Sequence, residues 1–196
     1  MKERTAARSV DIRSLIVRTA LRLFAERGYF NTSIHDIRKA ADISIGAIYH
    51  YFSGKEAIAK AIYDDLVARM AEAVAVVMKE LSTARDRSQA VIQLLFEMAE
   101  DDPEMMHFIL YARHREFMPD EPPICSSRPF ELMKDIVKEG MASGEIRPMD
   151  PLVAAAGLFG GAIRMIHLYM DGIIAPPLKQ HLEEVWSCGW RGIAHD

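Results

Sequence analysis

The chain has 196 residues, half of them hydrophobic, and a net charge of −4. This length fits one compact domain or a small module joined to a larger one, with enough apolar residues for a sizeable core. No stretch approaches the roughly 18 uninterrupted apolar residues of a membrane-spanning helix, so we expect a soluble protein. Residues 1–10 are not followed by the apolar region of a secretory signal, which predicts a cytoplasmic location.

Charge is distributed unevenly along the chain. Residues 1–60 hold 11 Lys and Arg against 6 Asp and Glu, and the remainder holds 13 against 22, which gives +5 and −9. Because attraction to phosphates extends only about 8–10 Å in physiological salt, this pattern favours a polyanionic partner at the N-terminal end. The alternative is a chance asymmetry.

The cysteines and histidines show no spacing typical of a metal site or a disulfide framework. Cys125 and Cys188 are far apart and lack CxxC spacing, and no histidine pair has HExxH spacing, although His107 and His114 stand two helical turns apart. We therefore predict no cofactor, no metal and no catalytic residue.

Apolar residues recur at the helical period almost throughout, and no run alternates as in a strand, so we predict an all-α fold of about nine helices. A first helix over residues 10–27 should end at Gly28. Ser33 and Asp36 resemble a capping box that opens a short second helix, and Ser44 can cap a third. Asp42, in the turn between them, tolerates a left-handed conformation.

A second capping box, Ser53 to Glu56, predicts a long fourth helix that connects the N-terminal module to the rest. Proline and glycine signals then predict helices over about residues 86–100, 102–118, 129–144, 150–170 and 178–193. We expect two domains, residues 1–52 with three helices and residues 53–196 with the larger helical set.

The predicted helix over residues 150–170 is apolar on nearly every side and rich in small residues. A helix of this kind must be covered on all sides, and a second copy of the chain is the natural cover, so we predict a homodimer. The alternative is a central helix of a monomer core. The residues that we assign to dimerisation are Ala155, Leu158, Phe159, Ala162, Ile166, Leu182, Val185 and Trp186.

Residues 29–58 read YFNTSIHDIRKAADISIGAIYHYFSGKEAI, and this segment closely resembles the TetR family of transcriptional regulators. The resemblance covers the first helix to the start of the fourth. Beyond it, the chain matches only in helix pattern, length and the GEIRPMDP connection at residues 144–151. It implies a helix-turn-helix DNA-binding domain at residues 1–52, and effector binding and dimerisation in residues 53–196.

The third predicted helix is the element expected to enter the major groove, which is about 12 Å wide. Ser44 can cap it and also receive a phosphate, and Gly46 lets the backbone come near DNA. Similarity to the family implies that Tyr49 and His50 face DNA; Tyr51 stays undecided and Phe52 is assigned to the core. The predicted DNA-binding residues are Thr32, Ser33, Ser44, Ile45, Gly46, Ala47, Tyr49, His50 and Lys55.

Two positions depart from the family pattern. Asp42 stands where the family very often has glycine, and it brings a carboxylate near the phosphates. Ile45 stands where many members carry a basic or small polar residue, and it offers an apolar contact to a thymine methyl instead of a guanine-reading donor pair.

The resemblance also implies a pocket for a small molecule among the helices of the larger domain. Methionine adapts to irregular ligand shapes, and polar groups in such a setting can orient a ligand. Core packing or solvated surface is the alternative for these side chains. The candidate ligand-binding residues are Met70, Phe108, Tyr111, His114, Met118, Met165 and His167.

The function that we predict is a homodimeric repressor, released from a near-palindromic operator by a small apolar or amphipathic effector. Alternatives are a transcriptional activator or an effector-independent DNA-binding protein. More distant alternatives are a protein-binding module and a helical enzyme built on residues 113–116, whose side chains would fan out over different helix faces. Steep salt dependence of operator binding would separate DNA binding from protein binding.

Overall fold

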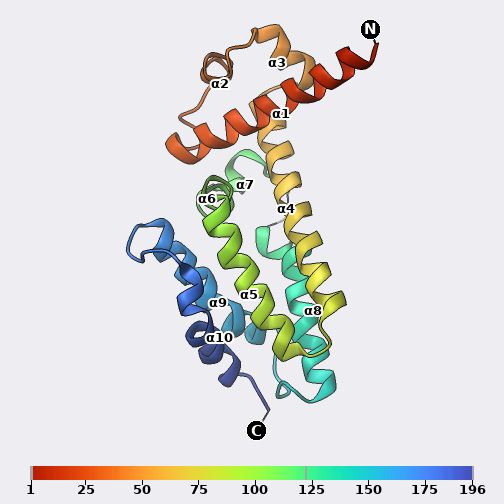
Figure 1. The fold of residues 1–196 in the computed structure, drawn as a ribbon, viewed down its shortest axis with the longest axis vertical. Coiled ribbons are helices and arrows are strands. Elements are labelled where there is room, and N and C mark those ends of the chain that lie inside the picture. Colours follow the sequence, from red (N-terminus) through yellow and green to blue (C-terminus); the bar gives the residue numbers. More distant parts are fainter. Residues whose placement is uncertain (1, 122, 196) are drawn as a thin grey trace. The chain divides into compact units, whose positions relative to one another are not determined.

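The computed structural model describes residues 2–121 and 123–195, and for residues 2–11 it describes the backbone alone. Within these ranges the regular elements are helices, and an isolated bridge joins Ile146 to Ala194, which confirms the all-α prediction. Figure 1 shows the helices in chain order. They are α1 (Lys2–Arg27), α2 (Ile34–Ala41), α3 (Ile45–Tyr51), α4 (Lys55–Glu80), α5 (Ala84–Asp101), α6 (Pro103–Tyr111), α7 (His114–Phe117), the 3-10 helix η1 (Ile124–Ser126), α8 (Arg128–Ser143), α9 (Pro151–Met170), the 3-10 helix η2 (Leu178–His181) and α10 (Leu182–Arg191).

Two predicted helices are interrupted in the structure. The helix predicted over residues 102–118 breaks after Tyr111 and resumes as the short α7 at His114. At this break the ring of His114 packs against Phe108 at 4.9 Å and against Tyr63 at 5.1 Å between ring centroids. Burial of that ring offsets the loss of helical hydrogen bonds, a tertiary effect that sequence periodicity does not report. The last predicted helix begins as the 3-10 turn η2.

The chain forms two compact units, residues 1–66 with 107–122 and residues 67–106 with 123–196. This division differs from the predicted boundary at residue 52, because the first part of α4, the end of α6 and all of α7 cluster with α1–α3. Contacts within the first unit account for the difference. The Lys60 ammonium lies 2.8 Å from a carboxylate oxygen of Glu121, and Tyr63 packs on His114.

In the first unit, α1 packs on both α2 and α3 (Figure 1). Ile16, Ala20, Ile37 and Ile48 from these three helices are completely buried. Because a three-helix module of this size has little core of its own, burial of these aliphatic side chains is the main apolar contribution to its stability.

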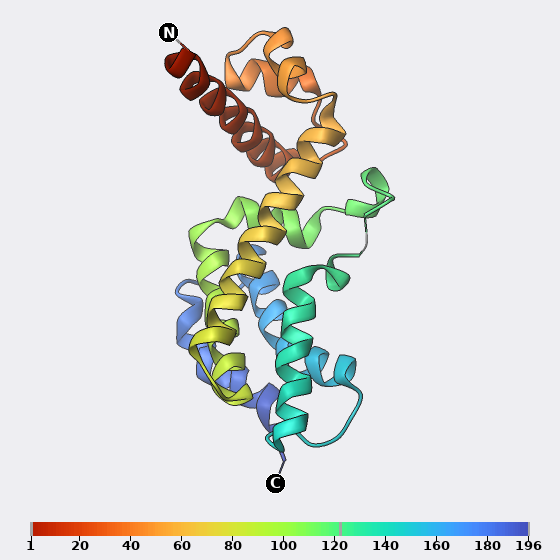
Figure 2. The ribbon, with the colours of Figure 1, turned by 90° about the vertical axis from the view of Figure 1, so that its right-hand side faces the viewer.

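The second unit has α5, α8, α9 and α10 as its packed helices (Figures 1 and 2). The indole of Trp186 on α10 donates a 3.0 Å hydrogen bond to the buried Ser88 hydroxyl on α5. α10 also approaches the backbone of α9 closely at Gly189, where a Cβ atom would lie 2.7 Å from the carbonyl oxygen of Leu158. Only glycine permits this approach.

Among the described residues, α9 is the helix that by length and composition alone could cross a membrane, with a mean hydropathy of 1.5 over its best 18-residue window, a property that it shares with core helices of soluble proteins. The structure corrects one expectation about α9. The predicted dimerisation residues Ala155, Leu158, Phe159, Ala162 and Ile166 are 9% exposed or less within a single chain, as is Trp186 on α10. They form core of the second unit, and only Leu182 and Val185 of the predicted set are half-exposed.

Candidate nucleic-acid interface

The entry to α2 is fixed by the predicted capping box. The Asp36 amide donates to the Ser33 hydroxyl oxygen at 3.1 Å, and the Ser33 amide donates to the Asp36 carboxylate at 2.8 Å. The hydrogen bonds from Ser33 hold the pKa of the Asp36 carboxyl below its usual value. Ser33 is exposed, so it remains available at the surface beside the first turn of α2.

Thr32 does not present its hydroxyl to DNA, contrary to the prediction. Its side chain is 1% exposed, and the hydroxyl donates to the backbone carbonyls of Gly28 at 3.0 Å and Leu23 at 3.3 Å. A buried hydroxyl with two acceptors at the end of α1 stabilises the turn between α1 and α2. The assignment of Thr32 as a phosphate ligand is therefore wrong for its side chain.

Lys55, also predicted to bind DNA, forms hydrogen bonds to the same turn. Its ammonium donates to the carbonyls of Tyr29 at 2.9 Å and Thr32 at 2.8 Å, and it lies 4.1 Å from the centroid of the Tyr29 ring. Burial lowers the pKa of Lys55, opposed by the nearby Glu56 carboxylate. Two of the three donors of the ammonium therefore stabilise the turn, and one donor is left for another group.

Tyr29 completes this cluster from the side of α1. Its hydroxyl donates to the Glu56 carboxylate at 3.1 Å. Burial, and then the hydrogen bond to Glu56 and its negative charge, raise the pKa of the tyrosine hydroxyl, so it stays protonated and remains a donor. The start of α4 is thus joined to the turn before α2 by two adjacent side chains, Lys55 and Glu56.

The turn between α2 and α3 has the predicted conformation. Asp42 adopts the left-handed region with φ 51° and ψ 49°, as expected for a residue in the place of a glycine. Ser44 then caps α3, because its hydroxyl oxygen accepts from the Ala47 amide at 3.0 Å.

One face of α3 is buried and the other is open to solvent. Ile48 is 0% exposed and Phe52 is 5% exposed, so Phe52 belongs to the core as predicted. On the opposite face Tyr49 is 56% exposed, with Ser44, Gly46 and His50 also exposed. The remaining predicted contacts, Ile45 and Ala47, are half-buried, and the half-buried Tyr51 packs edge-on against His50 at 4.8 Å.

An arginine that sequence reasoning did not assign lies beside α3. The guanidinium carbon of Arg13, on α1, stands 5.3 Å from the centroid of the Phe52 ring at the end of α3. The side chain is exposed, so its positive charge is in contact with solvent next to α3. Its position in the basic N-terminal region was the available signal, but its place beside α3 depends on the packing of α1.

The predicted ligand-binding residues are divided between the two units. Phe108, Tyr111, His114 and Met118 belong to the first unit, and Met70, Met165 and His167 belong to the second. Phe108 and Tyr111 line one cavity, while Met70 and Met118 are buried. Burial lowers the pKa of His114, whose ring nitrogen Nε2 lies 3.4 Å from the Ile109 carbonyl. His167 contacts the Ile163 carbonyl through Nδ1 at 2.8 Å.

The second unit contains a groove that the sequence reasoning missed. It has a volume of about 240 Å³ and lies between α8 and α9, with the side chain of Lys134 and the thiol of Cys125 among its walls. The apolar walls comprise Phe130, Met133, Leu152, Ala155, Ala156, Phe159, Gly160 and Ile163. The sequence shows that these residues are apolar, but it does not show which sides of α8 and α9 face each other.

Comparison with known sequences supports the N-terminal site. Residues 16–62 match the family described as bacterial regulatory proteins, tetR family. The HTH-type transcriptional regulator YuxN of Bacillus subtilis is 54% identical over 44 residues, which cover 22% of this chain and 15% of YuxN. The fatty acid metabolism regulator protein of Bacillus subtilis is 27% identical over 149 residues, which cover 74% of this chain and 76% of that protein.

Solved structures extend the likeness to the whole fold. The transcriptional regulator FadR from Bacillus subtilis, in complex with stearoyl-CoA, superposes with a TM-score of 0.76 at 23% identity over 92% of this chain and 98% of FadR. These relatives are regulators rather than enzymes, in agreement with the absence of a catalytic assignment. Residues 16–62, which hold the capped α2–α3 pair, therefore match the helix-turn-helix DNA-binding domain of the TetR family, and the chain as a whole is similar to transcriptional regulators of that family.

Proposed function

We propose that this protein is a homodimeric repressor that places α3 of each subunit in the major groove of an operator and is released by an amphipathic effector. The observation that carries the proposal is the two-faced α3, with Ile48 and Phe52 buried and Tyr49, His50 and Gly46 exposed. A dimer of this kind reads half-sites about 34–36 Å apart, in DNA within the bacterial cytoplasm.

Operator binding is tested with an inverted repeat taken from the DNA upstream of the protein's own gene. We expect Tyr49→Ala to weaken binding about tenfold, the cost of losing one contact to DNA. The matched control is Val76→Ala, because Val76 is 50% exposed but belongs to the second unit, whereas α3 belongs to the first. Fluorescence anisotropy at several salt concentrations should also give a steep salt slope. Equal affinity of the two variants would contradict the role of α3.

The dimer proposal rests on the exposed face of α9 instead of the buried residues first assigned. Leu152 and Val153 are 64% and 58% exposed, and Val153, Gly157 and Gly161 share one stripe at spacings of four. Gly157 and Gly161 are themselves exposed, although a Cβ atom at either position would be in van der Waals contact with the same chain, at 3.9 Å from Ile193 and 3.6 Å from Val185. A second copy related by a two-fold axis would cover this stripe.

Sedimentation velocity tests this interface. We expect the wild type to sediment as a dimer and Val153→Glu as a monomer, because a carboxylate in an apolar interface loses its hydration. Val76→Glu places the same charge on an exposed valine of α4 and should leave the dimer intact. If the Val153→Glu variant is still a dimer, the interface does not lie on this face of α9.

The groove between α8 and α9 supports an effector with a long acyl chain. Its walls are almost wholly apolar, and Lys134 lies among them as a cation for a phosphate or carboxylate head group. The structure of FadR from Bacillus subtilis holds stearoyl-CoA. An effector of this class would favour release by binding the operator-free state more tightly than the operator-bound state.

Stearoyl-CoA is the probe for this step. We expect it to dissociate the operator complex of the wild type, while Ala156→Trp, which fills the groove from an exposed position on α9, keeps operator affinity and loses the response. Ala68→Trp, an exposed alanine on α4, is the matched control. If stearoyl-CoA leaves the operator affinity of the wild type unchanged, this choice of effector is wrong. The proposal that the protein binds an operator through α3 would still stand, because a separate experiment tests it.

A further inference from the structure

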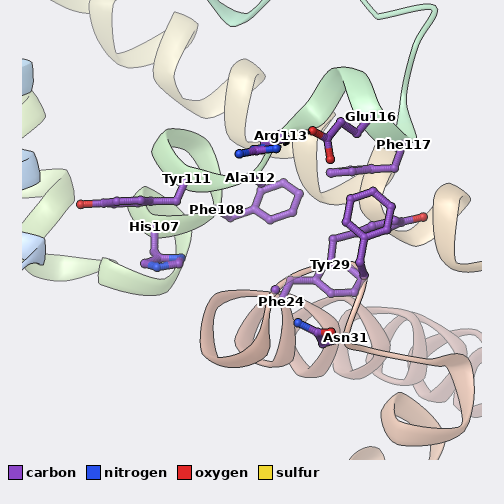
Figure 3. A pocket seen from close by; sticks show the side chains of 12 residues that line it. Phe24, Tyr29, Asn31, His107, Phe108, Tyr111, Ala112, Arg113, Glu116 and Phe117 are labelled. Carbon is purple, nitrogen blue, oxygen red and sulfur yellow. Dashed lines mark hydrogen bonds and ion pairs between the residues drawn. The ribbon is translucent and has the colours of Figure 1, made fainter.

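Two exposed aromatic side chains are not used by the proposed DNA, dimer or effector surfaces. Phe30 is 62% exposed in the turn after α1, and Tyr111 is 38% exposed at the end of α6. Both border the same cavity, which lies within the first unit (Figure 3). Exposed aromatic rings gathered around one hollow indicate an interaction site more strongly than the same rings scattered singly over a surface.

The cavity has a volume of about 200 Å³ and is formed by the end of α1, the turn that follows it, and the α6–α7 segment. Most of its lining is aromatic. The ring-bearing residues are Phe24, Tyr29, Phe30, His107, Phe108, Tyr111 and Phe117, and the polar ones are Asn31, Arg113 and Glu116.

The rings that line the cavity are stacked in pairs. Tyr29 and Phe117 are stacked with centroids 3.8 Å apart and planes 14° apart, and His107 and Tyr111 are stacked at 4.7 Å and 17°. In Figure 3 the ring of Phe108 lies between these two pairs. Since aromatic rings pair by offset stacking or edge-to-face contact, such walls are complementary to another flat ring.

The charges at the cavity are balanced. The guanidinium of Arg113 lies 3.0 Å from the carboxylate of Glu116, so the two charged side chains form one ion pair. The side-chain amide of Asn31, which donates to the Arg27 carbonyl at 2.9 Å, is a neutral polar group. A charged ligand would gain attraction from one member of the ion pair and repulsion from the other, whereas a neutral ligand is indifferent to both.

We propose that this cavity is a second small-molecule site, distinct from the α8–α9 groove, which binds a neutral, planar aromatic compound of one or two fused rings. An apolar cavity of roughly 150 Å³ is large enough to bind benzene, so the volume here suits a compound slightly larger. The site adjoins Tyr29 and so lies next to the turn that Lys55 and Glu56 hold in place before α2.

Calorimetric titration of 2-naphthol into the full chain tests the site. We expect saturable binding with one molecule per chain. Phe30→Ala should weaken it about three- to tenfold, the loss of one ring contact, without harming the fold, because Phe30 is largely exposed. Val76→Ala removes an exposed apolar side chain outside the cavity and should leave the affinity unchanged.

Three further titrations locate the site and define its chemistry. Tyr111→Ala should weaken binding as Phe30→Ala does, and Ala156→Trp, in the α8–α9 groove, should not. Naphthalene-2-carboxylate, the matched anion, should bind more weakly than 2-naphthol. Absence of saturable binding, loss of binding only in Ala156→Trp, or tighter binding of the carboxylate would each overturn the proposal.

Discussion

The short helices α2 and α3 and the pair formed by the long helix α9 and the ten-residue helix α10 are held in place by different kinds of contact. Around α2 and α3 the contacts are polar and directional: the Ser33 and Ser44 caps, and the Lys55 ammonium on two carbonyls. α9 and α10 instead meet through apolar burial and the close backbone approach at Gly189.

This difference follows from helix length. Helices of eight and seven residues are too short to be stable alone and bury little surface, so satisfied helix ends and an anchored turn contribute a large share of their stability. A twenty-residue helix such as α9 buries a full row of side chains, and its position depends on shape complementarity. The same type of substitution should therefore act differently in the two regions.

The largest effect is expected from Lys55→Met. The variant loses two charge-assisted hydrogen bonds to the turn before α2, and we expect the free energy of unfolding to fall by about 2–3 kcal/mol. Urea denaturation measures the change. Lys39→Met, at an exposed lysine of α2, is the control and should change stability by less than about 0.5 kcal/mol. Equal effects would show that Lys55 is only a surface charge.

Gly189→Ala tests the contact between α9 and α10. The added Cβ would lie 2.7 Å from the Leu158 carbonyl oxygen, so the helices must separate, at a cost of about 2 kcal/mol. Gly46→Ala is the counterpart in α3, where the nearest atom would be the Ser44 hydroxyl at 3.9 Å. The free energy of unfolding of that variant should rise by up to about 1 kcal/mol, because alanine has a higher helix propensity than glycine. A loss from Gly46→Ala would contradict the contrast.

The caps of α2 and α3 should contribute unequally. Ser33→Ala removes a hydroxyl that accepts from the Asp36 amide and donates to the Asp36 carboxylate, and it should cost about 1 kcal/mol. Ser44→Ala removes a single hydrogen bond, from the Ala47 amide, and should cost roughly half as much. Thermal unfolding followed by circular dichroism measures both. The reverse order would mean that the box around α2 is not the stronger cap.

The smallest effect is expected from the titration of His114. Burial lowers its pKa, so below its ordinary pKa of about 6.5 the unfolded chain binds a proton that the folded chain resists. Stability is therefore retained above that pH and declines as pH falls below it. Urea denaturation at pH 7.5 and pH 5.5 should show a smaller decline for His114→Phe than for the wild type. Identical declines would exclude this histidine as the cause.

Much of the fold and part of the site could be predicted from local residue patterns. The caps at Ser33 and Ser44 and the left-handed turn at Asp42 all occur as predicted, because each depends on residues within a few positions of one another. The outward position of Tyr49 also follows from the helical period once Ile48 is placed inside.

The amino-acid sequence by itself determined the helical class, the starts of the short helices and the family of DNA-binding regulators. Only the tertiary structure decided that Thr32 and Lys55 turn inward, and which side chains of α9 are exposed. The physical reason is that a cap is satisfied by its immediate neighbours. The choice of a buried face depends on helices distant in the chain, and an apolar pattern on nearly every side of α9 does not distinguish one face from another.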